Sequence, residues 1–231
     1  MMARTSKRRK KIEELVDRKK EYTLTEAVSV LKNGPKTGFD QTIEVAIKIS
    51  LDQTTNPIRG TVSLPHGTGK KTRIAVFCKG DFVDQAKEAG ADHVGGDELV
   101  QKVAGGWMDF DVAVATPDMM RELAKLGKVL GPRGLMPNPK SGTVTTEIGK
   151  AVRELHAGKI EYRMDKQSGI KAPVGKLSFS EEVLKENIDF FIKAVLTANP
   201  KIQRTQSLRS AVVSSTMGPG LRLDKSQFRQ G

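Results

Sequence analysis

The sequence predicts an α/β protein with two domains: a discontinuous basic α/β domain, a sheet plus helices, built from both termini, and a three-layer α/β domain inserted into it. In the middle of the chain, short apolar runs alternate with helical stretches, which is typical of a parallel, doubly wound sheet. Nearer both ends, the strands alternate apolar with polar residues instead. The charge divides in the same way: residues 70–158 carry 13 Lys and Arg against 12 Asp and Glu, whereas the remainder carry 26 against 15.

We place the basic domain at residues 1–69 plus 159–231 and the inserted domain at residues 70–158. An insertion at a surface loop needs closely spaced entry and exit points, so two chain segments connect the domains and form a natural hinge. Glycines stand at both connections, and the predicted hinge residues are Gly67, Gly69 and Gly158.

The basic domain begins with a basic arm at residues 1–20, flexible or partly helical. Thr23 and Glu26 have the spacing of a capping box and predict the start of a helix that ends at Gly34–Pro35. A second helix is expected to begin at Ser180 and end at Asn199–Pro200, because apolar residues recur between them at helical spacing. Strands are predicted over residues 42–49, 59–64, 159–164, 176–179 and 208–214.

The inserted domain is predicted to contain strands over residues 74–78, 93–94 and 112–115, with helices over 82–89, 98–103, 119–126 and 148–155. Before the last helix lies an unusual run, Gly131–Val144. Six of its fourteen residues are Gly or Pro, so neither a helix nor a central strand can continue through it. We expect a shaped loop.

Composition limits the kinds of partner. A formal net charge of +12 and a pI near 9.8 indicate that the partner is a polyanion. Nucleic acid is the first expectation for that partner, and an acidic membrane surface is the competitor. The basic N-terminus lacks the apolar segment of a secretory signal, and no apolar run approaches the ~18 residues that span a bilayer. The single cysteine, Cys78, is expected to be buried and inert, and it fits a reducing compartment, so we expect a cytoplasmic protein.

Sites for enzymatic chemistry are not evident. The segment His66–Lys71 resembles a phosphate loop, but Leu64 stands where the first glycine belongs and Lys71 where the motif requires Ser or Thr. Only Gly80 follows the strand at 74–78, which argues against a dinucleotide site. The three histidines are far apart and without ligand spacing. We therefore expect no enzyme, no cofactor and no metal.

Candidate RNA-binding residues lie in the basic domain. Hydroxyl side chains on and after the last strand, including Ser210 and Thr216, can bond 2′-hydroxyls and phosphates. Met217 offers a soft apolar surface, and Gly218 permits a close backbone approach. The alternative, a plain turn at the end of a sheet, is equally consistent with these residues. Further candidates are a lysine and an aromatic before the first strand and cations of the 159–176 hairpin: Lys36, Phe39, Arg163, Lys166 and Lys171.

Four separated stretches carry a resemblance to a known family. They are Phe39–Val45, Arg59–Gly67, Gly131–Val144 and Ser215–Gly220. In order and spacing they resemble the bacterial family of the first protein of the large ribosomal subunit, the L-one family, over essentially the whole chain. Its signature loop covers the following residues here: Gly131, Pro132, Arg133, Gly134, Met136, Pro137, Asn138, Pro139 and Lys140.

This resemblance implies that the basic domain binds the mobile stalk of large-subunit ribosomal RNA near the exit site, beside an inserted Rossmann-like domain. It further implies that the protein assists release of deacylated tRNA, represses its own messenger by binding a mimic of the ribosomal site, and is a monomer when free. By motif, RNA contacts would fall on Phe39, Thr42, Glu44, Ser210, Thr216, Met217 and Gly218. Glu44 would have to accept from base amino groups or 2′-hydroxyls, because a carboxylate repels phosphate.

Overall fold

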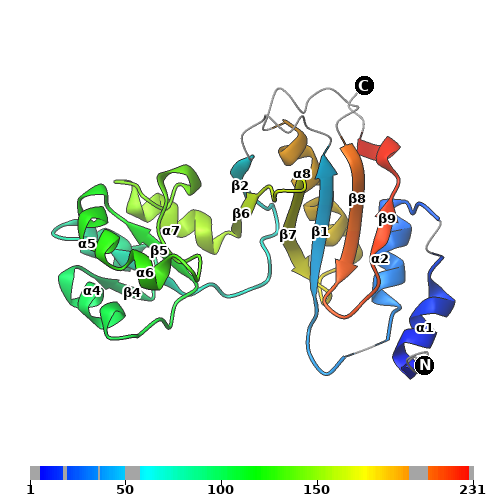
Figure 1. Cartoon of the computed structure of the whole chain (residues 1–231), viewed down its shortest axis with the longest axis horizontal. Helices are drawn as coiled ribbons and strands as arrows, with labels where there is room; N and C mark the ends of the chain where they lie inside the picture. The colour runs from blue at the N-terminus through cyan, green and yellow to red at the C-terminus, as the bar shows by residue number, and fades with distance from the viewer. Residues whose placement is uncertain (1–5, 18–19, 36, 50–57, 198–207, 229–231) are drawn as a thin grey trace. The chain divides into compact units, whose positions relative to one another are not determined.

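A computed structural model describes residues 6–17, 20–35, 37–49, 58–197 and 208–228 (Figure 1). The chain forms two compact units: unit 1 comprises Met1–Lys70 with Ile160–Gly231, and unit 2 comprises Lys71–Lys159. These boundaries lie one residue later than those drawn from charge and strand pattern. The predicted helix end at Asn199–Pro200 and the candidate Lys36 lie outside the described residues.

Unit 1 is built around a four-stranded sheet in which every neighbouring pair is antiparallel. Its order is β7 (Gly169–Lys176), β1 (Thr42–Ile49), β8 (Leu208–Ser215) and β9 (Leu221–Leu223). In β1 the odd-numbered residues are buried and the even-numbered ones are half-buried or exposed, as the alternation of the sequence predicts. The sheet therefore has one core face and one face open to partners.

Two helices, α2 (Leu24–Lys32) and α8 (Glu181–Thr197), pack on the core face of this sheet and on each other (Figure 1). Buried side chains such as Ile43, Ile188 and Phe191 join them to the strands in one apolar core. Of the two alternatives predicted for the arm, the partly helical one is found, because Lys7–Leu15 forms helix α1. A separate pair of strands, β2 (Arg59–Ser63) and β6 (Lys159–Arg163), lies where the chain passes to and from unit 2.

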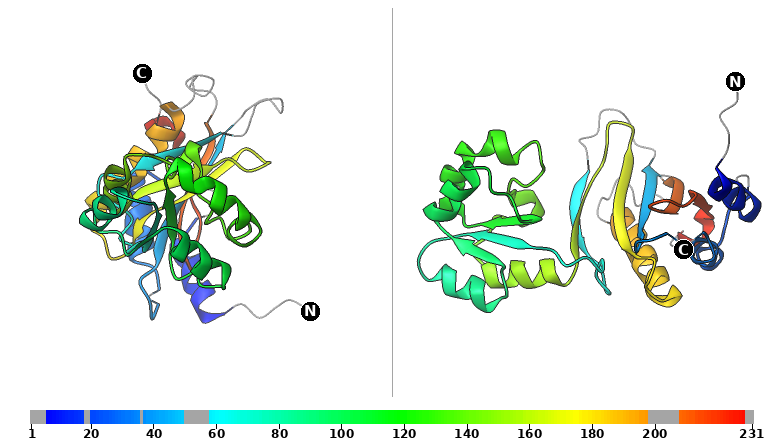
Figure 2. Two further views of the ribbon diagram at one scale, coloured as in Figure 1. Left: turned by 90° about the vertical axis from the view of Figure 1, so that its left-hand side faces the viewer. Right: turned by 90° about the horizontal axis from the view of Figure 1, so that it is seen from below.

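Unit 2 is a three-layer α/β structure, which confirms the predicted fold class. Its parallel sheet has the order β4-β3-β5, and helices flank it in both views of Figure 2. Alternate residues of β3 enter two separate apolar clusters, Ala75 and Phe77 on one face and Ile74 and Val76 on the other. The elements of unit 2 are β3 (Ile74–Phe77), α3 (Phe82–Glu88), β4 (His93–Gly95), α4 (Asp97–Ala104), β5 (Val112–Ala115), α5 (Met120–Lys125), α6 (Gly127–Leu130) and α7 (Ile148–His156).

One strand prediction was wrong, and one strand was missed. The strand expected over residues 176–179 is not found there. Strand β7 instead begins at Gly169, runs through Pro173 and ends at Lys176. Pro173 is tolerated where it lies beside a register shift between Ile43 and Glu44 on β1. The second error is β9, which sequence reasoning missed, because three residues of strand are too short to show a period.

Thr23→Ala is expected to lower the free energy of unfolding by about 1 kcal/mol, the usual cost of a lost N-cap. Thr23 Oγ1 accepts from the Glu26 N–H and the Glu26 carboxylate accepts from the Thr23 N–H, so the capping box is confirmed. Urea denaturation followed by circular dichroism measures the change. Thr25→Ala is the matched control, since Thr25 is exposed in the same turn and should cost nothing. Equal losses in both variants would contradict the cap assignment.

The same hydrogen bond from the Thr23 backbone holds the pKa of the Glu26 carboxyl below its ordinary value. This carboxylate therefore makes its full contribution to the free energy of unfolding at pH values above the pKa that Glu26 has in the unfolded chain. It is lost as the pH falls through the lower pKa of the folded state.

Candidate nucleic-acid interface

Five of the predicted RNA-binding residues gather at one end of the unit 1 sheet, where β1 begins and β8 ends. Antiparallel pairing of Ile43 with Ser215 brings the start of one strand beside the end of the other. We call this group the sheet-end cluster: Phe39, Thr42, Thr216, Met217 and Gly218. The cluster joins residues that are more than 170 positions apart in sequence, and the strand register fixes their arrangement.

Hydrogen bonds between Thr42 and Thr216 hold the cluster together. The Thr216 N–H donates to the Thr42 carbonyl at 3.0 Å, and the Thr42 N–H donates to Thr216 Oγ1 at 3.0 Å. Thr216 Oγ1 also donates to the Thr42 carbonyl at 3.3 Å. The hydroxyl proton of Thr216 is thus used within the protein, and the hydroxyl can offer RNA only an acceptor.

Two apolar side chains of the cluster are unusually exposed. Phe39 and Met217 each expose 53% of their surface, more than the other large apolar residues described. Gly218 lies tightly against Ser215, since a Cβ at position 218 would approach Ser215 Oγ to 2.2 Å. The turn therefore requires glycine for its close packing, and it presents Met217 outward.

Two residues beside the cluster were missed by sequence reasoning. Lys176 pairs with Thr42 across β1 and β7, and its ammonium donates to Thr42 Oγ1 at 2.9 Å. Gln41 is buried, and its Oε1 accepts from the Met217 N–H at 3.0 Å. The only signal for Lys176 was its place at the end of a basic hairpin. No signal in the sequence pointed to Gln41, because Met217, the residue it bonds, is 176 residues away.

The other predicted RNA-binding residues do not join the cluster. Glu44 lies on the open face one step into the sheet, opposite Ser214. Ser210 is opposite Lys48 and Lys171 is opposite Ala46, so both belong to the far half of a strand that spans roughly 20 Å from Thr42 to Lys48. The two strands of the predicted 159–176 hairpin, β6 and β7, pair with β2 and β1 rather than with each other. Arg163 at the end of β6 and Lys166 in the turn before β7 are exposed, beyond that far end. Any contacts they make with RNA would be at a second location along the sheet.

Hydrogen bonds within its second half hold the signature loop of unit 2 in shape. Asn138 Oδ1 accepts from the Lys140 N–H, and the Asn138 N–H donates to Thr143 Oγ1 at 2.8 Å. Val144 then forms a parallel bridge with Ala115 at the end of β5. Met136 is half-buried against the unit 2 core and Pro137 is buried. The exposed members are Gly131, Pro132, Arg133, Gly134, Pro139 and Lys140.

The predicted hinge glycines have the left-handed backbone that favours glycine, with φ of 64° at Gly67, 70° at Gly69 and 97° at Gly158. The first two are fixed to unit 1. Asn187 Nδ2 donates to the Gly67 carbonyl at 2.9 Å, and a Cβ at Gly69 would lie 2.7 Å from the Phe179 ring. That hinge function stays a prediction, and these contacts favour a pivot after Gly69.

The remaining features do not form a catalytic site. The segment from His66 leads into strand β3 rather than a helix, so it lacks the context of a phosphate loop. Asp109 and Asp111 both pair with Arg73. Cys78 is buried as predicted, and burial raises the pKa of its thiol. Across the described part of the chain no group of three His, Cys, Asp or Glu could hold a metal ion. Nor does any described helix combine the length and apolarity needed to cross a membrane.

Comparison with known proteins identifies the family of the chain. The model of the family described as Ribosomal protein L1p/L10e matches residues 30–219. The chain is 55% identical over 225 residues to the large ribosomal subunit protein uL1 of Protochlamydia amoebophila, covering 96% of this chain and 95% of that protein. It is 52% identical over 229 residues to uL1 of Chlamydia trachomatis serovar D (98% and 99%) and 51% identical over 233 residues to uL1 of Fervidobacterium nodosum (100% and 99%). The chain therefore belongs to the Ribosomal protein L1p/L10e family.

Proposed function

We propose that this protein is a non-enzymatic, structural constituent of the large ribosomal subunit in the cytoplasm, and that it binds the stalk of large-subunit ribosomal RNA through the sheet-end cluster. Family membership supports the ribosomal role. The observation that carries the RNA-binding surface is that two exposed apolar side chains, Phe39 and Met217, flank the hydrogen-bonded pair of Thr42 and Thr216. The Lys176 ammonium donates to the same Thr42 side chain. Exposed aromatic and apolar side chains stack on unpaired bases, and a cation on the same surface compensates phosphate charge.

The cluster suits RNA in its details. Bases turned out of a folded RNA can stack on Phe39, while Met217 packs against a base or sugar. Glu44, one step along the open face, accepts from base amino groups or 2′-hydroxyls. Cations at the hairpin, Arg163, Lys166 and Lys171, would meet phosphates farther along the stalk. Phosphate contacts orient such a complex, and the base and sugar contacts give it specificity.

Two finer functions follow from the family resemblance and are part of the proposal. Release of deacylated tRNA near the exit site would use the exposed cations of the signature loop, Arg133 and Lys140, because the anchoring hydrogen bond of Lys140 uses its backbone N–H and not its ammonium. Repression of the protein's own messenger would use the sheet-end cluster, because a leader that imitates the stalk must fit the same surface.

Titration of the full-length protein onto a stalk fragment of large-subunit RNA tests the main proposal. Affinity is expected to fall steeply with salt, because each phosphate contact releases counterions. An unrelated duplex of equal length is the control and should bind more weakly at every salt concentration. Equal affinity for both RNAs would overturn the proposal. The leader transcript in the same titration tests repression: it should compete with the stalk, and Met217→Ala should weaken both.

A further inference from the structure

The first helix of the chain makes an unexpected contact with the sheet-end cluster. Arg8 of α1 donates from Nη2 to two backbone carbonyl oxygens, that of Pro35 and that of Met217, each at 3.3 Å. Pro35 precedes the loop that carries Phe39, and Met217 is in the turn after β8. One guanidinium therefore bridges the two loops that present the exposed apolar side chains.

The backbone of Met217 is held from its other side as well. Its N–H donates to Gln41 Oε1, which is 3.0 Å away. Gln41 is 3% exposed, and its own carbonyl accepts from the N–H of Leu177, the residue after strand β7, at 2.8 Å, so its backbone is fixed as well. Both hydrogen-bonding groups of the Met217 backbone are thus engaged by side chains that lie outside the proposed contact set.

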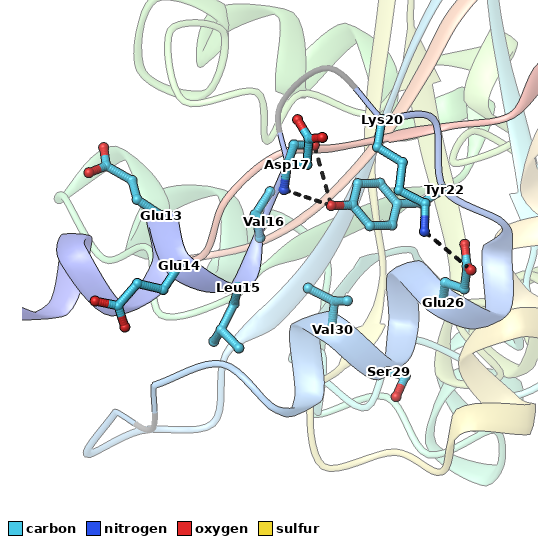
Figure 3. Close-up of a pocket in the computed structure, with 10 residues that line it drawn as sticks. All are labelled: Glu13, Glu14, Leu15, Val16, Asp17, Lys20, Tyr22, Glu26, Ser29 and Val30. Carbon is cyan, nitrogen blue, oxygen red and sulfur yellow. Dashed lines mark hydrogen bonds and ion pairs between the residues drawn. The ribbon is translucent and has the colours of Figure 1, made fainter.

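Contacts at the end of helix α1 fix the helix in place, and they thereby fix the position of Arg8. The Asp17 N–H donates to the Tyr22 hydroxyl at 2.9 Å, and that hydroxyl donates to the Asp17 carbonyl at 3.3 Å (Figure 3). Val16 packs against the unit 1 core. Ile12 and Val16 also line a hollow with Pro219 and Gly220 of the turn, which places α1 alongside that turn.

Two of the three guanidinium nitrogens of Arg8 have structural surroundings. Its Nε is enclosed and has no hydrogen-bond partner among the described residues. A guanidinium that meets phosphate does so with a solvent-accessible fork of donors. Here Nη2 is committed to carbonyls and Nε is out of reach of solvent, so neither is available to an incoming phosphate.

We propose that Arg8 and Gln41 are positioning residues that hold the Met217 backbone between them and so set the RNA-binding geometry of the sheet-end cluster before RNA arrives. The inference rests on the proposed function of that cluster. A side chain held in its binding arrangement loses less freedom on association, which raises affinity without adding a contact. The basic arm contributes through Arg8 by shaping the surface, in addition to any charge it carries.

Hydrogen exchange of the Met217 amide in the free protein tests the geometry without RNA. Gln41→Met removes the acceptor at similar size, and exchange at Met217 should accelerate at least tenfold, the scale of losing a hydrogen bond that closes a turn. Gln41→Glu keeps an acceptor oxygen and should restore protection. Unchanged exchange in Gln41→Met, or no restoration in Gln41→Glu, would overturn the role of Gln41.

Binding of the RNA stalk fragment tests Arg8. Arg8→Ala should weaken binding roughly tenfold, the usual effect of a lost charge-assisted hydrogen bond, and leave the slope of log affinity against log salt unchanged. Lys10→Ala is the matched control: it removes one charge from an exposed position of the same helix and should weaken binding much less. Circular dichroism confirms that each variant is folded.

Three results separate the possible failures. A slope reduced by just under one in Arg8→Ala would make Arg8 a phosphate contact and overturn its positioning role. Equal losses of affinity in Arg8→Ala and Lys10→Ala would show that the effect comes from net charge alone, and this would also overturn the positioning role of Arg8. Failure of the unaltered protein to prefer the stalk fragment would instead refute the proposed function itself, whereas the amide-exchange result would still stand.

Discussion

Asn187→Leu is expected to lower the free energy of unfolding of unit 1 by about 3 kcal/mol, because it leaves one buried and two part-buried backbone groups without partners. Asn187 is fully buried in helix α8. Its Oδ1 accepts from the His66 N–H at 3.2 Å, and its Nδ2 donates to the carbonyls of Gly67 and Val174 at 2.9 and 2.8 Å. Leucine fills a similar volume but satisfies none of these groups.

The chain offers an internal reporter for this experiment. Its single tryptophan, Trp107, is in unit 2, so tryptophan fluorescence follows that unit alone, while circular dichroism follows both. In urea, the unit 1 part of the dichroism transition should move to lower denaturant and the fluorescence transition should stay in place. Lys193→Leu, at an exposed position of the same helix, should change stability by less than about 0.5 kcal/mol, the scale of one helical ion pair. A common shift of both transitions would show that the units do not unfold separately.

Phe39→Ala and Met217→Ala are each expected to weaken binding to the stalk RNA by roughly 1–3 kcal/mol, or about fivefold to more than a hundredfold in Kd. The physical reason is the loss of stacking and packing on two side chains that the fold leaves half exposed. Neither carries charge, so the salt dependence of binding should not change. Titrations at three salt concentrations measure both quantities.

Matched controls for these two variants are present elsewhere in unit 1. Phe190 on helix α8 and Leu15 at the end of α1 are exposed to a similar degree, 46% and 47%, but lie outside the cluster. Phe190→Ala and Leu15→Ala should leave Kd unchanged. If they weakened binding as much as Phe39→Ala and Met217→Ala, exposed apolar surface in general would be responsible. The sheet-end cluster would then lose its assignment.

Local patterns in the sequence were sufficient for most of the fold. The capping box of Thr23 and Glu26, the alternation in β1 and the apolar runs of unit 2 each depend on neighbouring residues, and each was confirmed. Short elements were harder to predict from the sequence. Three-residue β9 has no period to detect, and the position of β7 depended on a register shift opposite Pro173.

The candidate site was only partly predictable, for a different reason. Motif residues such as Phe39 and Met217 could be named, but their separation from Arg163, Lys166 and Lys171 depends on strand register. Arg8 and Gln41 act on Met217 across 209 and 176 residues, and such contacts leave no trace in a single sequence. Supporting residues of this kind are identified by their hydrogen bonds in the folded protein.

The order of strands in unit 1 has a consequence for synthesis. Strand β1 is completed early, yet both of its neighbours, β7 and β8, come after the whole of unit 2. A nascent chain can thus form the inserted unit while β1 still waits for partners. The sheet-end cluster exists only once residues 208–218 have been made, so a truncated product would lack the proposed RNA-binding surface. The topology in this way restricts the proposed surface to chains whose translation is almost finished.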